Sequence, residues 1–151
     1  LELSENDVYR VRVAGLLHDI GFVSVPDEVI NKKEHLSSGE WEKIKSHPEV
    51  GASILEHIAS LECFLPAIRH HHEHFDGEGY PDGLSRDQIP LGARIIAVAD
   101  AYQAMVCDRP YRQALTRQQA IDELQLSSGT QFDPVVVAAF ISLMKANEPV
   151  A

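Results

Sequence analysis

The stretch RHHHEHFDGEGYP, residues 69–81, carries half of the eight histidines of the chain in its first six residues, followed by an acidic, glycine-rich turn. Neutral imidazole is the commonest metal ligand in proteins, and a glycine-rich turn lets backbone approach a ligand closely. The pattern therefore predicts a metal-centred active site. Two other segments are suited to meet it, namely His18-Asp19 at the end of an apolar helix and Asp100 within the apolar segment IIAVADAY.

Helix signals on both sides of this stretch predict an all-α bundle. Apolar residues recur at three- and four-residue spacing, which gives each helix one apolar face. Ser4, Ser37 and Thr116 each precede Asp, Glu or Gln by three positions, which resembles the capping box that begins helices. Pro48 and Pro134 suit first helical turns. Helices are expected over about 6–20, from 37, over 48–61, from 65 into the histidines, over 91–107, from 116 and over 133–144, with 22–38 as a loop.

Composition and charge restrict the class of protein. The chain has 151 residues, of which 44% are hydrophobic and 24% charged, as expected for one globular domain with a buried core. Its net charge of −10 argues against polymeric nucleic acid as a partner, because binding a phosphate backbone needs a basic surface. A small phosphorylated ligand stays open, since metal ions and a few arginines could neutralise it.

The sequence also indicates where the domain works. No apolar run reaches the roughly 18 residues of a membrane span, and no signal-peptide pattern opens the chain. We therefore expect a cytoplasmic domain without membrane contact. Cys63 and Cys107 lie far apart in apolar segments, which favours buried free thiols. Because the first residue is Leu1 and not Met, we expect the chain to be part of a longer protein.

Several histidines have a plainer interpretation than metal binding. His35 and His57 stand among polar residues and are expected at the surface. His47 lies at the junction of two helices and, taken alone, fits a surface or capping residue. His70 and His74 are four positions apart, share one helix face and fit a solvated surface. A solvated surface does not explain four histidines beside an apolar helix.

The remaining candidates form one set of imidazoles and carboxylates. Asp19 and Asp100 stand in apolar helices, where an unpaired carboxylate is costly, so a partner or a metal is expected. The set contains no thiolate, which suits Fe, Mn, Ni or Zn, and ligand type does not choose among them. Two ions bridged by a carboxylate can hydrolyse phosphate esters, and Asp19 is the natural bridge. The six candidates are His18, Asp19, His47, His71, His72 and Asp100.

These motifs resemble those of a known family. HDIG, residues 18–21, resembles the signature of the HD superfamily of metal-dependent phosphohydrolases, and HHEHFDGEGYP, residues 71–81, resembles the second signature of its HD-GYP branch. The likeness continues in IPLGARIIAVADAY, DRPYR and GTQFDP, so residues 1–151 are interpreted as one HD-GYP domain. The resemblance implies an HD-type helical bundle with a metal centre in its core, which hydrolyses cyclic di-GMP to linear pGpG or GMP.

The resemblance also implies a role for each motif residue. The six candidates would bind metal, with His18 and Asp19 as the catalytic pair. The expected cofactor is two divalent ions, Fe or Mn, with a third in the full-length protein. Substrate binding would fall to Arg109 and Arg112, which would contact phosphate, and to Gly79, Tyr80 and Pro81, which would shape the substrate-side loop.

The chain departs from the family pattern at three points. Phe22 stands where the family usually carries Lys, which removes a cation near the scissile phosphate, so we expect a slow phosphodiesterase. Gln103 replaces a second Asp and is expected to be a structural change. The family's preceding helices, which can add a His and a Glu for a third metal, are not in this sequence, so we expect two ions.

Two other functions stay open. A degenerate, non-catalytic HD-GYP domain would bind cyclic di-GMP or a partner such as a diguanylate cyclase domain. Another HD-type nucleotide phosphohydrolase is the third interpretation. The presence of all six candidate ligands favours catalysis, whereas Phe22 favours the non-catalytic domain. In either case an upstream receiver or sensor domain is the expected neighbour in a signalling protein.

Overall fold

The computed structural model describes residues 1–108 and 113–146. In this part of the chain the helices are joined by turns and loops, and the β-type pairing is one isolated bridge between Ser128 and Phe132. The predicted all-α class is confirmed. In chain order the elements are α1 (Glu5–Leu17), η1 (Ile20–Ser24), α2 (Asp27–Ile30), α3 (Ser38–Lys45), α4 (His47–Leu55), η2 (Ala59–Phe64), α5 (Leu65–Arg69), η3 (Arg86–Gln88), α6 (Leu91–Val106), α7 (Arg117–Leu126) and α8 (Pro134–Ala146), where η marks a 3-10 helix.

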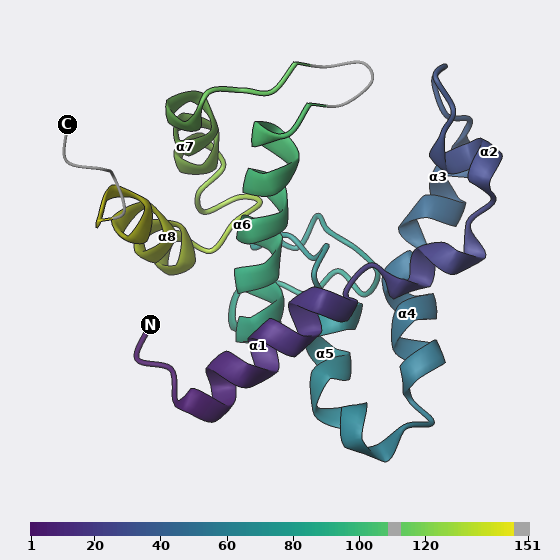
Figure 1. The fold of residues 1–151 in the computed structure, drawn as a ribbon, viewed down its shortest axis with the longest axis horizontal. Helices are drawn as coiled ribbons and strands as arrows, with labels where there is room; N and C mark the ends of the chain where they lie inside the picture. Colours follow the sequence, from purple (N-terminus) through teal and green to yellow (C-terminus); the bar gives the residue numbers. More distant parts are fainter. Residues whose placement is uncertain (109–112, 147–151) are drawn as a thin grey trace.

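Helix α6 is the central element. Figure 1 shows it in the middle of the molecule, with α7 and α8 on one side, α4 and α5 on the other, and α1 crossing its lower end. Two hydrophobic cores meet on α6, because Val98 faces one and Ile96 faces the other. The first core joins α6 to α7 and α8, and the second joins it to α1, η2 and α5. A side chain on α6 can therefore meet residues from both ends of the chain.

The local signals for helix starts are confirmed. Ser4, Ser37 and Thr116 each form a reciprocal capping box with the side chain three residues later. Pro48 stands in the first turn of α4, and Pro134 begins α8. These contacts lie within four residues of one another, so they depend little on the rest of the fold.

Other boundaries were predicted wrongly. Residues 22–38 are not one loop, because η1 extends into them as far as Ser24 and α2 lies within them. Helix α4 ends at Leu55, before the expected residue 61. Helix α5 ends at Arg69, so the histidines that follow lie on turns and not on a helix face. The reason is tertiary: the backbone N–H of Tyr80 donates to the carbonyl of His72 (3.1 Å), which folds the glycine-rich turn back onto the histidines.

Two expectations about surface and membrane have different outcomes. Cys63 and Cys107 are free thiols as expected, but both are exposed, so their predicted burial is wrong. Cys63 lies on η2 at the rim of a surface groove, and Cys107 caps the end of α6. Among the described residues, no helix combines the length and the apolar character needed to cross a bilayer.

Candidate metal centre

Four segments bring the predicted ligands together. His18 and Asp19 follow the last residue of α1, and His47 begins α4. His71 and His72 lie on the turn after α5, and Asp100 comes from α6. The sequence thus identified side chains that are up to 82 positions apart, from His18 to Asp100, and that converge in the fold.

Three of these histidines are oriented by the same local device. The Nδ1 atom of each lies within hydrogen-bond distance of the carbonyl oxygen three residues earlier. An imidazole that donates from Nδ1 keeps its proton there and presents the lone pair of Nε2, which is the usual arrangement of a metal-binding histidine. The contacts join His18 to Gly15 (2.8 Å), His47 to Ile44 (2.6 Å) and His71 to Ile68 (2.6 Å).

The Nε2 atoms then face one another across a small space. Nε2 of His47 lies 3.3 Å from Nε2 of His71. If both rings carry their proton on Nδ1, this contact sets two lone pairs against each other, which favours a cation between them. Bonds of 2.0–2.2 Å from one ion place neighbouring ligand atoms about 3.0–3.5 Å apart, so the observed spacing fits a shared metal.

Asp19 lies between the histidines with an oxygen for each side. Its Oδ1 is 3.4 Å from Nε2 of His47 and 3.9 Å from Nε2 of His71. Its Oδ2 is 3.3 Å from Nε2 of His18, an atom that is shielded from solvent and has no hydrogen-bond partner with good geometry in the described chain. This carboxylate can therefore reach two ions.

The donor atoms fall into two overlapping groups, each with its atoms within 4.8 Å of one another. One group is His47, His71 and His72, and the other is His18, Asp19 and His71. Asp100 stands at the rim, with Oδ1 3.9 Å from Nε2 of His18. The geometry thus fits two neighbouring cations.

Asp19 and Asp100 are more exposed than the sequence predicted. The side chain of Asp19 is 53% exposed and that of Asp100 is 39% exposed, so neither is the deeply buried carboxylate that the apolar helices suggested. The helix ends before Asp19, which turns its side chain toward the opening of the site. Convergence with imidazoles, and not burial, is what marks both residues.

Burial and mutual repulsion keep two of the imidazoles neutral. Desolvation is the main cause that lowers the pKa of His71 to about 4 and that of His72 to about 3, and neighbouring imidazoles add to it. Burial alone would raise the pKa of Asp19, but the imidazoles of His18 and His47, whose Nε2 atoms lie 3.3 and 3.4 Å from its oxygens, outweigh burial and hold that pKa well below its ordinary value. The nearby Asp19 carboxylate in turn raises the pKa of His18. Near neutral pH, Asp19 is therefore ionised and two imidazoles are ready to bind metal.

Two glycines allow the segments to approach this closely. A Cβ on Gly21 would collide with the carbonyl of His47 and lie 2.7 Å from the backbone nitrogen of Gly51, so η1 can rest on α4 because residue 21 has no side chain. A Cβ on Gly79 would overlap the backbone of Glu73 and His74. The glycines of HDIG and GYP thus set the distance between ligand-bearing segments.

Two aromatic rings flank the centre. Phe22 stacks on His47, with ring centroids 4.0 Å apart and an angle of 18° between the planes. Tyr80 stacks on His72 at 5.0 Å and 25°. Burial, with the nearby charges of Asp100 and Asp19, raises the pKa of Tyr80 to about 12, so its hydroxyl stays protonated.

The GTQFDP segment, residues 129–134, is hydrogen-bonded to the chain that follows the histidine turn. The backbone N–H groups of Phe75 and Asp76 donate to the carbonyls of Gln131 (3.1 Å) and Thr130 (2.9 Å), which ties the histidine turn to the chain before α8. A cavity of about 150 Å³ lies between these two segments and α6. Its walls include His71, His72, His74, Asp100 and Gln131.

The other predicted residues have mixed outcomes. Arg109 and Arg112 lie outside the described residues. His35 and His57 are exposed as expected. The solvated position expected for His70 is wrong, because its side chain is only 13% exposed. Sequence reasoning also missed Glu73, whose buried carboxylate accepts hydrogen bonds beyond the GYP turn; its place directly after the histidine pair was the available signal.

Comparison with known proteins identifies the family. Residues 1–136 match the family described as HD domain, and the chain belongs to it. The chain is 41% identical over 146 residues to the cyclic di-GMP phosphodiesterase response regulator RpfG of Xanthomonas campestris, covering 93% of this chain and 38% of that protein. It is 39% identical over 145 residues to a cyclic di-GMP phosphodiesterase of Thermotoga maritima, covering 95% of this chain and 39% of that protein.

Solved structures agree on the fold. A crystal structure of the cyclic GMP-AMP specific phosphodiesterase V-cGAP3 of V. cholerae superposes with a TM-score of 0.74 at 22% identity, over 97% of this chain and 40% of that chain. Bd1817, an HDG"Y"P protein from Bdellovibrio bacteriovorus, superposes with a TM-score of 0.73 at 18% identity, over 95% and 45%. The family match and the curated relatives confirm the resemblance to the HD-GYP branch. The family together with the His/Asp cluster indicates divalent metal binding. The chain spans 38–45% of the length of these proteins.

Proposed function

We propose that this domain is the catalytic part of a metal-dependent phosphodiesterase that hydrolyses cyclic di-GMP to linear pGpG, to GMP, or to both, in bacterial second-messenger signalling. The observation that carries the proposal is the set of Nε2 atoms of His18, His47 and His71 around the carboxylate of Asp19. Curated relatives named cyclic di-GMP phosphodiesterases support the choice of substrate.

Two divalent ions, Fe or Mn, would be held by His18, Asp19, His47, His71, His72 and Asp100, with a third ion in the full-length protein. When bound, such ions stabilise charge on phosphoryl oxygens and acidify a water molecule. The residues of the chain supply the rest. Asp19 fixes the spacing of the two donor groups, and the backbone carbonyls behind the histidines hold each ring in one orientation.

The substrate is proposed to enter beside the GYP turn. Gly79, Tyr80 and Pro81 would shape this side of the opening, with the Tyr80 hydroxyl kept as a hydrogen-bond donor by its raised pKa. Arg109 and Arg112 would neutralise phosphate in a chain whose net charge is −10. That charge also supports a dinucleotide, and not a polymeric nucleic acid, as the ligand.

The alternative is a non-catalytic domain that binds cyclic di-GMP or a partner such as a diguanylate cyclase domain. Phe22 favours it, because its ring covers one face of His47 where a lysine would offer a positive charge. An upstream receiver or sensor domain is part of either proposal, and RpfG, a response regulator by name, supports it.

Product chromatography with the full-length protein tests the proposal, combined with elemental analysis of the same preparation. We expect more than one metal per chain, and conversion of cyclic di-GMP that stops when a chelator is added. A metal-loaded protein that binds cyclic di-GMP but leaves it intact would favour the non-catalytic alternative. Faster cleavage of a different nucleotide would favour another HD-type phosphohydrolase.

Arg109→Ala tests substrate binding separately. We expect the concentration of cyclic di-GMP at half-maximal rate to rise about 10- to 100-fold, because a charge-assisted contact to phosphate contributes roughly 1–3 kcal/mol. The metal content should not change. Unaltered binding of cyclic di-GMP would show that this arginine does not contact the substrate.

A further inference from the structure

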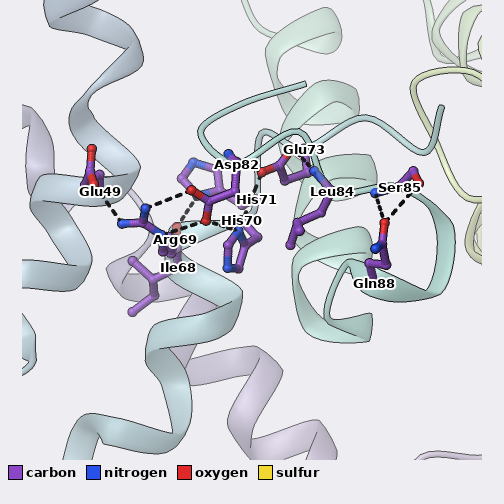
Figure 2. Close-up of polar contacts among 10 residues, drawn as sticks. All are labelled: Glu49, Ile68, Arg69, His70, His71, Glu73, Asp82, Leu84, Ser85 and Gln88. Carbon is purple, nitrogen blue, oxygen red and sulfur yellow. Dashed lines mark hydrogen bonds and ion pairs between the residues drawn. The ribbon is translucent and has the colours of Figure 1, made fainter. Parts of the chain in front are cut away.

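A second group of donor atoms lies beside the metal centre, on the other side of the histidine turn. It consists of Nδ1 of His70, at the end of α5, Oε1 of Glu73, and Oδ2 of Asp82, which follows the GYP turn. These atoms lie within 4.8 Å of one another. Figure 2 shows Asp82 and Glu73 on either side of His70, with Arg69 next to Asp82. None of the three residues belongs to the donor groups of the first centre.

His70 carries the observation that points to a ligand. Its Nδ1 atom is shielded from solvent and has no hydrogen-bond partner within the described chain. Both nearby carboxylate oxygens lie 3.6 Å away, which is beyond hydrogen-bond distance. A nitrogen and an oxygen that share one ion at 2.0–2.2 Å are about 3.0–3.5 Å apart, so a small adjustment lets a cation satisfy all three atoms.

Hydrogen bonds fix the carboxylates of Glu73 and Asp82 in positions that suit such an ion. The side chain of Glu73 is fully buried and accepts hydrogen bonds from the backbone N–H groups of Asp82 (2.7 Å) and Leu84 (3.1 Å). Arg69 donates to both oxygens of Asp82 at 3.0 Å, which fixes that carboxylate and lowers its pKa. Hydrogen bonds therefore orient both carboxylates without the ion.

The local charge leaves room for a divalent cation. Arg69 donates to Asp82 and, at 3.1 Å, to Glu49, so one guanidinium is shared by two carboxylates. Glu73 accepts hydrogen bonds from two backbone N–H groups. The three carboxylates, those of Glu49, Glu73 and Asp82, thus outnumber the one guanidinium. A groove of about 420 Å³ between α4 and α5 reaches Arg69 and His70 and gives an ion a path from solvent.

We propose that His70, Glu73 and Asp82 form a second divalent-cation site, separate from the phosphodiesterase centre, and that it takes zinc. Zinc binds both imidazole nitrogen and carboxylate oxygen, and three such protein ligands leave a fourth position for water. The ion joins the end of α5 to the residue directly after Gly79-Tyr80-Pro81. It therefore fastens the GYP turn in place, next to the ligands His71 and His72, without taking part in the reaction.

Zinc content of matched variants tests the site. The full-length protein is saturated with zinc, passed through a desalting column and measured by elemental analysis, alongside His70→Gln and Asp82→Asn. Each variant is expected to hold one zinc per chain fewer than the unaltered protein. His57→Gln removes a histidine that is 86% exposed, and Glu49→Gln loosens Arg69 without touching the donor atoms, so both controls should keep the full load.

Two further measurements keep the test decisive if a variant folds poorly. Anomalous diffraction at the zinc edge from the unaltered protein should give a peak between Nδ1 of His70 and the two carboxylates. Zinc should also slow hydrogen exchange at the amides of Asp82 and Leu84 in the unaltered protein but not in His70→Gln. Full zinc content in both variants, or a zinc-soaked crystal without that peak, would show that these residues form an ion-pair network only and would overturn the proposal.

Discussion

The metal centre and the His70–Glu73–Asp82 group contain adjacent residues, His71 and His70, yet they are built in different ways. In the centre, His71 is anchored through Nδ1 to the carbonyl of Ile68 and presents Nε2. In the neighbouring group, His70 presents Nδ1, and the anchored residue is Glu73, held by two backbone N–H groups. The turn after α5 therefore directs adjacent imidazoles to different sites.

The difference shows what each arrangement can do. Four histidines and Asp19 supply the two donor groups of the centre, and the 53% exposure of Asp19 leaves it open on one side, as a site that admits substrate must be. The neighbouring group is tied to Arg69 and to the chain beyond the GYP turn, so it is suited to hold structure. Adjacent residues can thus have different roles when a turn points their side chains in different directions.

Substitution of Asp19 should distinguish the metal centre from the His70–Glu73–Asp82 group most clearly. Asp19→Ala is expected to lower turnover of cyclic di-GMP more than about 100-fold and to reduce the metal content, because changes around the ligands alone already cost 10–100-fold. Asp82→Asn should lower turnover less than about tenfold. Rates and metal content measured on the same samples check both. An Asp19→Ala protein with its full metal load would exclude a bridging role for this carboxylate.

The contact between the GYP turn and the histidine turn, which lies beside both sites, can be broken with one methyl group. Gly79→Ala should lower the free energy of unfolding by roughly 2–4 kcal/mol, since its Cβ would overlap the backbone of Glu73 and His74. Urea unfolding measures the effect.

Gly39→Ala is the matched control for that substitution. Gly39 lies in α3, and a Cβ there would meet no atom within 4 Å, so alanine should stabilise the protein by up to about 1 kcal/mol through its helix propensity. Equal destabilisation by the two substitutions would contradict the close approach at Gly79.

Acidification should lower the free energy of unfolding of the metal-free protein, because the centre contains buried imidazoles. His71 and His72 have folded-state pKa values of about 4 and about 3, against 6.5 when unfolded. Between pH 7 and pH 5 the unfolded chain therefore binds more protons, and the free energy of unfolding falls as pH falls, by roughly 2 kcal/mol for each histidine. The raised pKa of His18 opposes this in part.

Urea unfolding in the presence of a chelator at pH 7, 6 and 5 measures this dependence. His72→Asn, which removes one of the two titrating groups, should show a shallower slope. His57→Gln, at an exposed position, should keep the original slope. Stability that rises on acidification over this range would contradict the neutral state assigned to these imidazoles.

The smallest expected change in rate concerns Phe22, whose ring stacks on His47. The His70–Glu73–Asp82 group has no such stacked ring among the described residues. Phe22→Lys should accelerate turnover by about tenfold at equal metal content, because a cation beside the centre stabilises charge on the phosphoryl oxygens. Phe22→Leu removes the stacked ring without adding charge and separates the two contributions. If Phe22→Lys is no faster than the unaltered protein when fully metallated, the missing lysine does not limit the rate.

Prediction from sequence succeeded for features that depend on nearby residues. The helix starts at Ser4, Ser37 and Thr116 follow from hydrogen bonds across three positions, and the structure has all three. Asp19 and Asp100 were selected because carboxylates in apolar helices are costly, and both lie near the cluster although neither is deeply buried. The residue types were informative even where the assumed burial was wrong.

The sequence by itself determined the helical class, the family and the identity of the candidate ligands, since these depend on periodicity, capping and motif spacing. The tertiary structure decided which ring nitrogen each histidine presents, that Glu73 is buried beneath the GYP turn, and that His70 and His71 serve different sites. The physical reason is that α5 ends at Arg69: beyond it, hydrogen bonds to His72, Thr130 and Gln131 set the path of the chain, and two of those partners are more than 50 residues away.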